Sequence, residues 1–419
     1  MDQPPVETHR LDNGLHVVLV PDDRVPVVSA SLWYAVGSAH EQKGRSGFAH
    51  LFEHMMFQGS AHVAKGEHFG LVQAAGGRAN AYTGLDATVY NDTVPSHELE
   101  LVLWLEADRM ATLADALTKE KLDNQRSVVQ NERRKRVDNV PYGSWEERSH
   151  PLAFLPEHPY HHSAWGSMDE LAAASLAEVC DFFTAHYLPN NAVLTLVGDL
   201  EPGRAVALVE RHFGPIPAGS DPPGPPGRTD AVAEGGARTE VRGQGPLPRL
   251  YVACTVPAFG EDGYHAADLS VDLLATGRAS RLQRTLVRGS QLAQAVEAWI
   301  TELRLGASLI LFEVTGRPGV AMGALEAAVD AELDRLAAEA PVAEELERVR
   351  THRRARRAKL WEKARDRADR IGLYACLLGD PLPAFGERER DADIGPEQVV
   401  ETARTWLARS RRSYLWYLP

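Results

Sequence analysis

The chain has 419 residues, which is enough for two or three domains of ordinary size with a buried core in each. An apolar fraction of 44% and a charged fraction of 25% are typical of globular proteins, and no apolar run of about 18 residues predicts a membrane span. The formal net charge of −13 argues against a nucleic-acid partner.

The cysteines indicate a compartment. Cys180, Cys254 and Cys376 are odd in number, far apart and set among apolar residues, as expected of buried free thiols. Free thiols persist in reducing compartments. Residues 1–7 also lack the basic and apolar segments of a secretory signal. We therefore expect a cytoplasmic protein.

The first predicted elements are two strands and a loop. Residues 11–20 begin with the turn Asn13-Gly14 and continue into a β-branched run, and residues 27–35 form a second strand of the same character. The polar segment 37–46 is punctuated by glycine and is expected to be a loop. It leads the chain into a helix of unusual composition.

The helix predicted from residue 47 to residue 57 is apolar except for His50, Glu53 and His54. At helical spacing the two imidazoles lie one turn apart on one face, and Glu53 leans to the same side. Imidazole nitrogens are preferred zinc ligands, and a catalytic zinc site takes three protein ligands with a fourth position for water. A carboxylate beside that water can act as a general base, and the order H-x-x-E-H is the inverted zinc-peptidase signature.

A purely structural interpretation of these residues is the alternative. His50 and His54 would then be core histidines that share Glu53 as a hydrogen-bond partner. Burial of three ionisable groups among phenylalanine, leucine and methionine side chains is costly unless a metal or strong pairing compensates. The pattern therefore favours a metal site.

Two strands and a series of helices follow. The strands are predicted at residues 76–83, which begin with a glycine pair, and at residues 86–92. Apolar periodicity predicts amphipathic helices at 97–113 and 120–137. The remaining elements expected in this half are a helix at 176–186, a strand at 192–197 and a helix at 206–213.

A proline-rich segment divides the chain. Residues 214–227 contain too many prolines to form a helix or a central strand. We therefore expect an N-terminal domain at residues 1–217, a Pro/Gly-rich linker at 218–237 and a C-terminal domain at 238–419.

The second half repeats the order of elements in the first. Strands are expected at 250–256, 294–301 and 307–315, and helices at 264–274, 320–338 and 343–367. Residues 265–269, His-Ala-Ala-Asp-Leu, stand where the first half has its histidine helix, but they lack the second histidine. This echo indicates internal duplication and not a second metal site.

Basic residues are concentrated in two clusters, at 133–136 and 353–359. Both clusters fall in segments with helical periodicity and acidic neighbours. We therefore interpret them as solvated faces of helices and not as a nucleic-acid site.

Further motifs follow His50-Leu51-Phe52-Glu53-His54 in a fixed order. Together these motifs resemble the pitrilysin/insulinase family of inverted-motif zinc peptidases, and the chain is most similar to short bacterial relatives of mitochondrial processing peptidase. The likeness covers nearly the whole chain and is weaker in the second half. The motifs are Phe57-Gln58-Gly59, Gly76-Gly77-x-x-Asn80-Ala81-x-Thr83, Val128-Val129-Gln130-Asn131-Glu132, Tyr187-x-Pro189-Asn190-Asn191 and Val197-Gly198-Asp199.

The resemblance implies an α+β fold with two homologous domains, each an antiparallel-rich β-sheet flanked by helices. It also implies Zn²⁺ as the cofactor, with Glu132 as the third ligand after His50 and His54, and Glu53 as the catalytic base. Spacing alone leaves several other acidic residues open as the third ligand: Glu98, Glu106, Glu120 and Asp123.

Three further residues match positions that contact substrate in the family. Asn80 and Ala81 match an edge-strand segment that pairs with extended substrate, and Phe57 matches a residue lining the pocket after the scissile bond. Without the resemblance, Asn80 would be an ordinary residue at the start of a strand, and Phe57 would be an ordinary core residue.

The chain departs from the family pattern at three positions. Gln125 replaces an acidic residue seven positions before Glu132, which leaves the surroundings of the metal less negative. Active relatives also carry an arginine and a tyrosine in the C-terminal half, in a pattern like Leu-Arg-x-x-x-Gly-Leu-Ala-Tyr. The matching positions here are Val287 and Gln294, so this half lacks both substrate-gripping groups.

The sequence therefore predicts a zinc metalloendopeptidase that cuts extended or unfolded peptides with the help of a partner subunit. We expect a heterodimer with a paralogous chain that supplies the arginine and the tyrosine; a homodimer using Arg288 or Gln294 of the second copy is the alternative. Two other functions stay open: a non-catalytic structural subunit of a processing-peptidase-like complex, and a metal-binding chaperone that captures peptides without cutting them. Neither a membrane nor a nucleic acid is expected as a partner.

Overall fold

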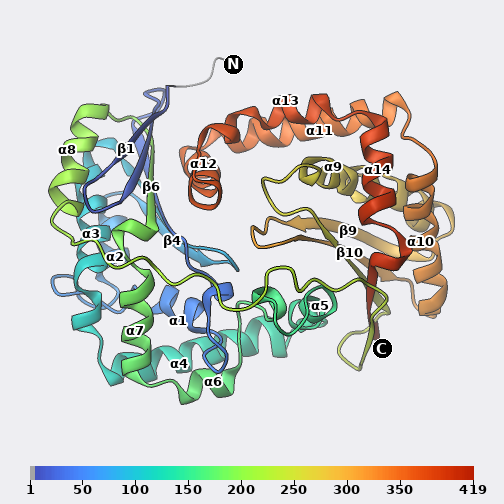
Figure 1. Cartoon of the computed structure of the whole chain (residues 1–419), viewed down its shortest axis with the longest axis horizontal. Helices are drawn as coiled ribbons and strands as arrows, with labels where there is room; N and C mark the ends of the chain where they lie inside the picture. Colours follow the sequence, from blue (N-terminus) through green and yellow to red (C-terminus); the bar gives the residue numbers. More distant parts are fainter. Residues whose placement is uncertain (1–4) are drawn as a thin grey trace. The chain divides into compact units, whose positions relative to one another are not determined.

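The computed structural model describes residues 5–419, and the chain divides into two compact units (Figure 1). The first unit comprises Met1–Glu132, Ala164–Pro226 and Arg357–Gly386. The second unit comprises Arg133–Ser163, Gly227–Arg356 and Glu387–Pro419.

The first unit is built on a six-stranded sheet with the order β1-β2-β6-β3-β5-β4. Strands β2 and β6 run parallel, and every other neighbouring pair is antiparallel. The strands are β1 (Glu7–Arg10), β2 (His16–Pro21), β3 (Val27–Tyr34), β4 (Arg78–Thr83), β5 (Thr88–Pro95) and β6 (Ala192–Gly198).

Helices cover both faces of this sheet. The apolar residues of α1 (Phe48–Met55), α3 (Leu99–Ala116) and α7 (Leu176–His186) form one core with the sheet. Helix α12 (Ala364–Leu378) packs on β3, β5 and β6. The other helices that contribute to this unit are α2 (Glu67–Ala74), α4 (Lys119–Arg133), α6 (Met168–Ala173) and α8 (Pro202–Phe213).

Strand β3 shows why the sheet needs cover on both faces. Its β-branched and aromatic residues are buried along nearly the whole strand. Val28, Ala30 and Leu32 alternate into the core with α1 and α3. Trp33 points the other way, where a Cβ added to Gly372 of α12 would lie 2.3 Å from its Nε1. Helix α12 therefore lies very close to the second face.

The second unit repeats most of this topology. Its five-stranded sheet has the order β7-β11-β8-β10-β9, with β7 and β11 parallel and the other pairs antiparallel. This order matches β2-β6-β3-β5-β4 of the first unit strand for strand. The predicted α+β class with antiparallel-rich sheets is therefore confirmed. The strands are β7 (Arg238–Arg242), β8 (Arg249–Val256), β9 (Ala293–Thr301), β10 (Ser308–Gly316) and β11 (Arg412–Leu418).

The helices of the second unit also lie on both faces of its sheet. Figure 1 shows α9 (Tyr264–Ala275), α10 (Met322–Ala338) and α14 (Pro396–Trp406) packed together on one side of β9 and β10. Helix α5 (Trp145–Ala153) packs on β8 and β11, where Trp145 stacks on Tyr251 with ring centroids 5.8 Å apart. The remaining helices are α11 (Ala343–Glu362) and α13 (Glu387–Asp393).

Each sheet is covered on one face by a helix that the predicted boundaries assign to the other half. Helix α5 falls within 1–217 but belongs to the second unit, and α12 falls within 238–419 but belongs to the first. The division in space thus differs from the predicted domains at these two segments. A sheet with apolar residues on both faces needs a helix on each. The periodicity of a helix does not say which sheet it will cover.

The last long helix predicted from the sequence is broken. The pattern predicts one helix at 343–367, but α11 ends at Glu362 and α12 begins at Ala364. Between them, Lys363 is extended, with φ −98° and ψ 132°. The prediction of a single helix was wrong. Neither glycine nor proline marks the break. The chain enters the first unit at Arg357, within α11, and after the break α12 packs on β3, β5 and β6 of the first sheet.

The helices that follow β3 and β8 begin with the same kind of cap. Gly47 and Gly263 precede α1 and α9 with φ values of 90° and 88°, a left-handed conformation that favours glycine. Counting three residues from each cap places Ala266 opposite His50, so His265 is one residue out of register. The second half therefore repeats the fold but not the histidine pair.

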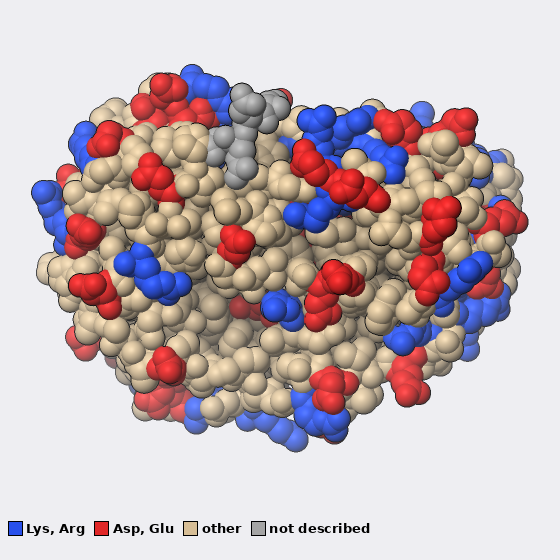
Figure 2. Space-filling model, turned by 45° about the horizontal axis from the view of Figure 1, so that its top comes forward, with Lys and Arg blue, Asp and Glu red and all other residues tan. Residues whose placement is uncertain are grey.

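The basic residues predicted to be solvated have mixed surroundings. Figure 2 shows Lys and Arg interspersed with Asp and Glu on the face it displays. Arg354 and Lys359 are exposed, as expected. Arg353, however, is only 1% exposed. The prediction is wrong for Arg353, because its guanidinium is enclosed by carboxylates of its own unit.

Two further features are the state of the cysteines and the apolar character of the helices. Cys180, Cys254 and Cys376 are free thiols, of which Cys254 is buried and the other two are half-buried. Among residues 5–419, no helix combines the length and the apolar character that a membrane crossing requires.

Candidate active site

Helix α1 is anchored at its N-terminus by a buried carboxylate. The backbone amides of Gly47 and Ala49 each donate a hydrogen bond of 2.8 Å to Glu41, which is 4% exposed. A negative charge at this place also complements the positive end of the helix dipole. These contacts fix where α1 begins.

The apolar face of α1 packs on aromatic side chains of α7. Phe52 stacks on Phe182 and Phe183, with ring centroids 5.5 and 5.9 Å apart. Leu51 and Met55 are fully buried beside it. Because the core occupies this face, the polar residues of α1 lie on its other side.

Three polar side chains converge there. The Nε2 atoms of His50 and His54 lie 3.3 Å apart. A carboxylate oxygen of Glu132, on α4, lies 3.1 Å from Nε2 of His54 and 3.6 Å from Nε2 of His50. All three side chains are half-buried, so solvent still reaches the group. Of the acidic residues that spacing left open, Glu132 is the one that joins the two histidines.

The spacing of these atoms fits a tetrahedral zinc ion. Zinc binds imidazole nitrogen and carboxylate oxygen at about 2.0–2.2 Å, so two ligand atoms of one tetrahedral site lie about 3.3 Å apart. The measured separations of 3.1, 3.3 and 3.6 Å bracket this value. Two imidazoles and one carboxylate are also a donor set of catalytic zinc sites with an open fourth position. The residues present therefore fit the metal.

Glu53 is held beside this group by a strand residue. Thr83, at the end of β4, donates a hydrogen bond of 2.7 Å from Oγ1 to Oε2 of Glu53. The bond orients the carboxylate, which a general base requires. Thr83 is not among the predicted site residues, although the Asn80-Ala81-x-Thr83 run contains it. Its role becomes visible only when β4 is placed beside α1.

Trp165 closes one side of the group. Its ring meets the imidazole of His50 edge to face, with centroids 5.0 Å apart and an interplanar angle of 78°. Such a contact restricts the orientation of the imidazole. The sequence gives no signal for Trp165, because the segment around it carries no recognised motif.

Asn80 and Ala81 lie on β4, at the edge of the first sheet. The backbone of β4 pairs with β5, so that Asn80 faces Asn91 and Ala81 faces Tyr90. In the described part of the chain no strand pairs with the other side of β4. An edge of this kind can accept an extended peptide as an added strand. Contact of these two residues with substrate stays a prediction.

Phe57 packs against other aromatic and cationic side chains. Its ring stacks on Phe69 at 4.3 Å, meets His68 edge to face at 5.5 Å and lies 5.1 Å from the guanidinium of Arg109. These contacts account for a phenylalanine at this position without a substrate. The predicted pocket-lining role of Phe57 stays a prediction.

A buried ionic cluster adjoins Phe57. Nε2 of His68 lies 3.3 Å from Asp92, and Glu106 makes a two-pronged contact with Arg109. Burial raises the pKa of Glu106 to about 7 and lowers the pKa of His68 to about 4. Such residues can form a metal site, but the guanidinium of Arg109 already supplies a cation. We therefore assign this cluster a structural role.

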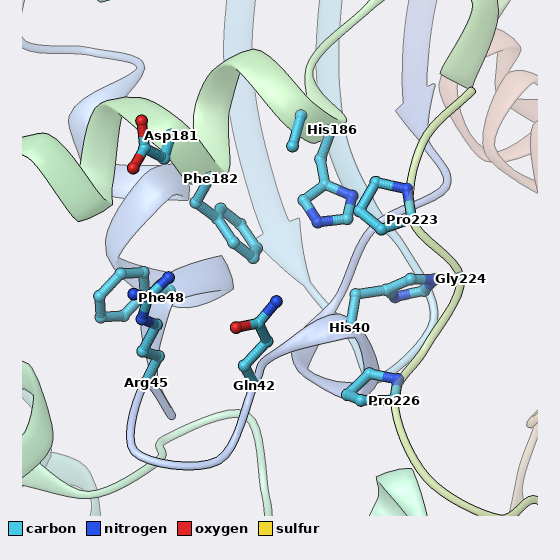
Figure 3. Close-up of a pocket in the computed structure, with 11 residues that line it drawn as sticks. His40, Gln42, Arg45, Phe48, Asp181, Phe182, His186, Pro223, Gly224 and Pro226 are labelled. Atoms are coloured by element: carbon cyan, nitrogen blue, oxygen red, sulfur yellow. The ribbon is translucent and has the colours of Figure 1, made fainter. Parts of the chain in front are cut away.

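A cavity of about 210 Å³ lies on the α7 side of α1 (Figure 3). It is lined by Phe48, Phe182, His40, His186, Pro223, Gly224 and Pro226, among others. Burial lowers the pKa values of His40 and His186 to about 4, so both imidazoles are neutral at pH 7. His50, His54, Glu53 and Glu132 do not line this cavity, which is therefore a separate feature of the first unit.

Comparison with known proteins identifies the family. A model described as insulinase (peptidase family M16) matches residues 16–153, and a model described as peptidase M16 inactive domain matches residues 173–352. The zinc protease PqqE of Helicobacter pylori is 32% identical over 99% of this chain and 93% of its own length. The chain belongs to the insulinase family, peptidase family M16. The predicted family is thus confirmed.

Other M16 proteins are similar over smaller shares or at lower identity. Subunit beta of the mitochondrial-processing peptidase of Blastocladiella emersonii is 25% identical over 52% of this chain and 46% of that protein. The crystal structure of a protease from Helicobacter pylori matches with a TM-score of 0.93 and 28% identity over the whole of both chains. The periplasmic protease PqqL from Escherichia coli, at 20% identity and a TM-score of 0.78, covers 99% of this chain and 48% of its own and shows the fold alone.

The positions at which this M16 chain departs from active relatives differ in their surroundings. Gln125 is buried, and its Nε2 donates a hydrogen bond of 3.1 Å to Asn124. Val287 is half-buried against the core of the second unit, whereas Gln294 is exposed on β9. Neither Val287 nor Gln294 carries the charge of an arginine.

Proposed function

We propose that this M16 protein is a zinc-dependent endopeptidase that cleaves extended or unfolded peptides. Relatives named zinc proteases support the metalloprotease class and the metal. In this proposal His50, His54 and Glu132 hold the zinc, and Glu53 is the general base. The observation that carries it is the convergence of three fitting donor atoms beside a carboxylate oriented by Thr83.

In the proposed mechanism, each of these residues has a separate role. Bound zinc lowers the pKa of a water ligand and polarises a carbonyl group. Glu53 takes the proton from the attacking water and passes it to the leaving amine. Thr83 keeps the Glu53 carboxylate in place. Asn80 and Ala81 align the peptide along the open side of β4.

Metal analysis and a cleavage assay test this proposal together. The wild-type chain, with its partner chain present, should carry one zinc ion and cut an unstructured fluorogenic peptide. His50→Ala and Glu132→Ala each remove a ligand and should lose zinc and activity together, because two remaining ligands make a weak site. Undiminished zinc in both variants would show that the metal binds elsewhere.

A non-catalytic structural subunit is the second candidate. The match of residues 173–352 to a model described as an inactive domain favours it, as do Val287 and Gln294 in place of arginine and tyrosine. Such a subunit would hold zinc without turnover, alone or with any partner. Peptide cleavage that depends on Glu53 would exclude this function.

We also propose that a paralogous chain completes the site in a heterodimer. Loss of one donor to the developing oxyanion typically costs about 10²- to 10³-fold in rate, and the second half offers no arginine or tyrosine at the matching positions. The relative named as a subunit of the mitochondrial-processing peptidase supports paired subunits. A homodimer that uses the exposed Arg288 is the alternative.

The partner proposal is tested by one assay in two formats. The chain is assayed alone and then mixed with its paralogue, using the same flexible peptide. The mixture should be faster by at least the roughly 10²-fold that one missing donor costs. Equal rates would contradict the heterodimer. An isolated chain that cuts efficiently only as a dimer would instead identify the homodimer.

We propose a cytoplasmic location on the strength of the three free thiols. A relative of similar fold is a periplasmic protease. Fractionation of cells that express the full-length protein would decide the location, and recovery outside the cytoplasm would contradict it.

A further inference from the structure

Strand β4, which carries Thr83, is contacted by helix α12 on the face of the sheet opposite to Glu53. Side chains alternate along a strand, so Tyr82 points away from the face on which Thr83 meets Glu53. The hydroxyl of Tyr82 donates a hydrogen bond of 2.8 Å to Oδ1 of Asp369, on α12. Helix α12 therefore reaches the edge strand β4 through a side-chain contact.

Asp369 ties two strands to α12. Its Oδ1 also accepts a hydrogen bond of 3.4 Å from Nδ2 of Asn91, on the neighbouring strand β5. Asp369 is half-buried, and this burial raises the pKa of its carboxyl group. Since Asn91 is only 2% exposed, the contact lies in the interior of the first unit.

The position of α12 is itself tightly set. Gly372 leaves no room for a side chain, because its Cβ would lie 2.3 Å from Nε1 of Trp33. The ring of Trp33 in turn meets Tyr82 edge to face, with centroids 6.1 Å apart. Near the start of the same helix, Arg367 forms a buried ion pair with Asp22. These contacts fix the position of α12, and therefore the position of Asp369 relative to β4.

We propose that Asp369 and Tyr82 are positioning residues of the peptidase site, which hold β4 where Thr83 orients Glu53 and where an extended peptide pairs. This inference rests on the proposed function. Strand β4 is hydrogen-bonded along one side only, so its position depends on side-chain contacts more than that of a central strand does. Because β4 contacts both the catalytic base and the peptide, a shift of the strand affects both turnover and binding.

A double-mutant cycle tests the contact. Asp369→Ala and Tyr82→Phe both remove the bond between these two residues, and Asp369→Ala also removes the bond from Asn91, so the double variant should be no worse than Asp369→Ala alone. We expect kcat/KM to fall about 10-fold in each, less than the roughly 10²-fold that a misplacement of about 1 Å at a reacting centre can cost. Asp369→Asn keeps an acceptor oxygen and should restore most of the activity. Independent, multiplying losses would contradict a shared role.

Two substrates separate positioning from general damage. A long extended peptide should show a higher KM and a lower kcat in Asp369→Ala, because it pairs with β4 and depends on Glu53. A short peptide that spans only the scissile bond should show a lower kcat at unchanged KM. Asp366→Ala, one turn earlier on the same helix, is the matched control and should leave both constants unchanged. Equal effects on the two substrates would contradict the inference.

Hydrogen exchange of the metal-free protein gives a readout that is independent of activity. The amides of β4 that bond to β5 should exchange faster in Tyr82→Phe and Asp369→Ala, but not in Asp366→Ala. If Asp369→Ala fails to fold, Tyr82→Phe keeps the test valid, because it removes a single hydroxyl. Exchange and kinetics equal to wild type would overturn the inference while the proposed function stands. A wild-type chain that cleaves no peptide, either alone or with its partner chain, would instead contradict the proposed function.

Discussion

The two units differ in the polar groups that lie beside corresponding helices. In the first unit, α1 and α4 bring together His50, His54 and Glu132 with the spacing of a zinc site. In the second unit, α9 and α11 enclose Arg353, which is 1% exposed. Its guanidinium contacts three carboxylates at 2.5, 2.7 and 2.8 Å, those of Asp268, Asp272 and Asp391.

The difference shows how one topology serves two purposes. The group in the first unit is half-buried and uses neutral or acceptor atoms, so it can take up a metal and leave a position open for water. The group in the second unit has its positive charge built into the chain, on a guanidinium that is only 1% exposed. The guanidinium of arginine stays protonated, and unlike a metal ion it has no coordination position that a water molecule could occupy. The second group can therefore stabilise the fold but cannot hold a reactive water.

The largest expected effect is the loss of stability in Arg353→Met. Removing the guanidinium takes its positive charge away from the buried carboxylates of Asp272 and Asp391, and breaking a buried ion pair from one side costs about 3–5 kcal/mol. Urea unfolding measures the loss. Arg354→Met, at the exposed neighbour, is the control and should stay within about 0.5 kcal/mol of wild type. Equal stabilities of the two variants would contradict a sealed cluster.

The stability of the first unit should instead depend on zinc. At a free zinc concentration about 100 times Kd, binding to the folded form alone stabilises it by about 2.7 kcal/mol. Chelation should therefore lower the Tm of the wild-type protein. His54→Ala should show no such shift, because it has lost a ligand. A zinc-dependent shift of wild-type size in His54→Ala would place the metal outside this group.

A smaller effect is expected for Thr83→Val, which removes the hydrogen bond to Glu53 at nearly constant volume. We expect kcat to fall about 10-fold, a part of the roughly 10²- to 10⁴-fold that general-base catalysis supplies. Zinc content should be unchanged, since Thr83 does not contact the ligand atoms. A variant with the wild-type kcat would show that Thr83 does not orient the base.

The smallest expected effect is on the pH dependence of stability. It concerns the buried ionic cluster of the first unit, in which Arg109 is the cation. Burial lowers the pKa of His68 to about 4, below the value of about 6.5 in an unfolded chain. Between these two values the unfolded state binds more protons, so stability falls as pH falls. His68→Gln should reduce this dependence by at most about 1.4 kcal/mol per pH unit. Urea unfolding at neutral and mildly acidic pH measures it, and an unchanged slope would contradict the prediction.

Local sequence patterns predicted much of the fold. The apolar periodicity of residues 176–186 predicts a helix, and α7 occupies Leu176–His186. The strand predicted at 250–256 lies within β8, Arg249–Val256. His50, Glu53 and His54 are recognisable because all three belong to one helix, where spacing alone places them on one face.

Features that depend on contacts between distant segments could not be predicted in this way. Nothing in the periodicity of α5 or α12 shows that each covers the sheet of the other half. The sequence gives no sign that Arg353 is buried, because its neighbours in the chain are exposed and charged. Thr83 lies in a visible motif, but its hydrogen bond to Glu53 requires β4 and α1 to be placed side by side.

Replacement of Glu53 by glutamine tests the central claim most directly. Glu53→Gln keeps the size of the side chain and can still accept a hydrogen bond from Thr83, but it cannot take the proton of the attacking water. The zinc content of the purified variant and its cleavage of an unstructured peptide are measured on the same sample, with the partner chain present. We predict one zinc ion per chain, as in wild type, and a rate lower by at least about 10²-fold. Cleavage at the wild-type rate with zinc bound would contradict the assignment of Glu53 as the general base.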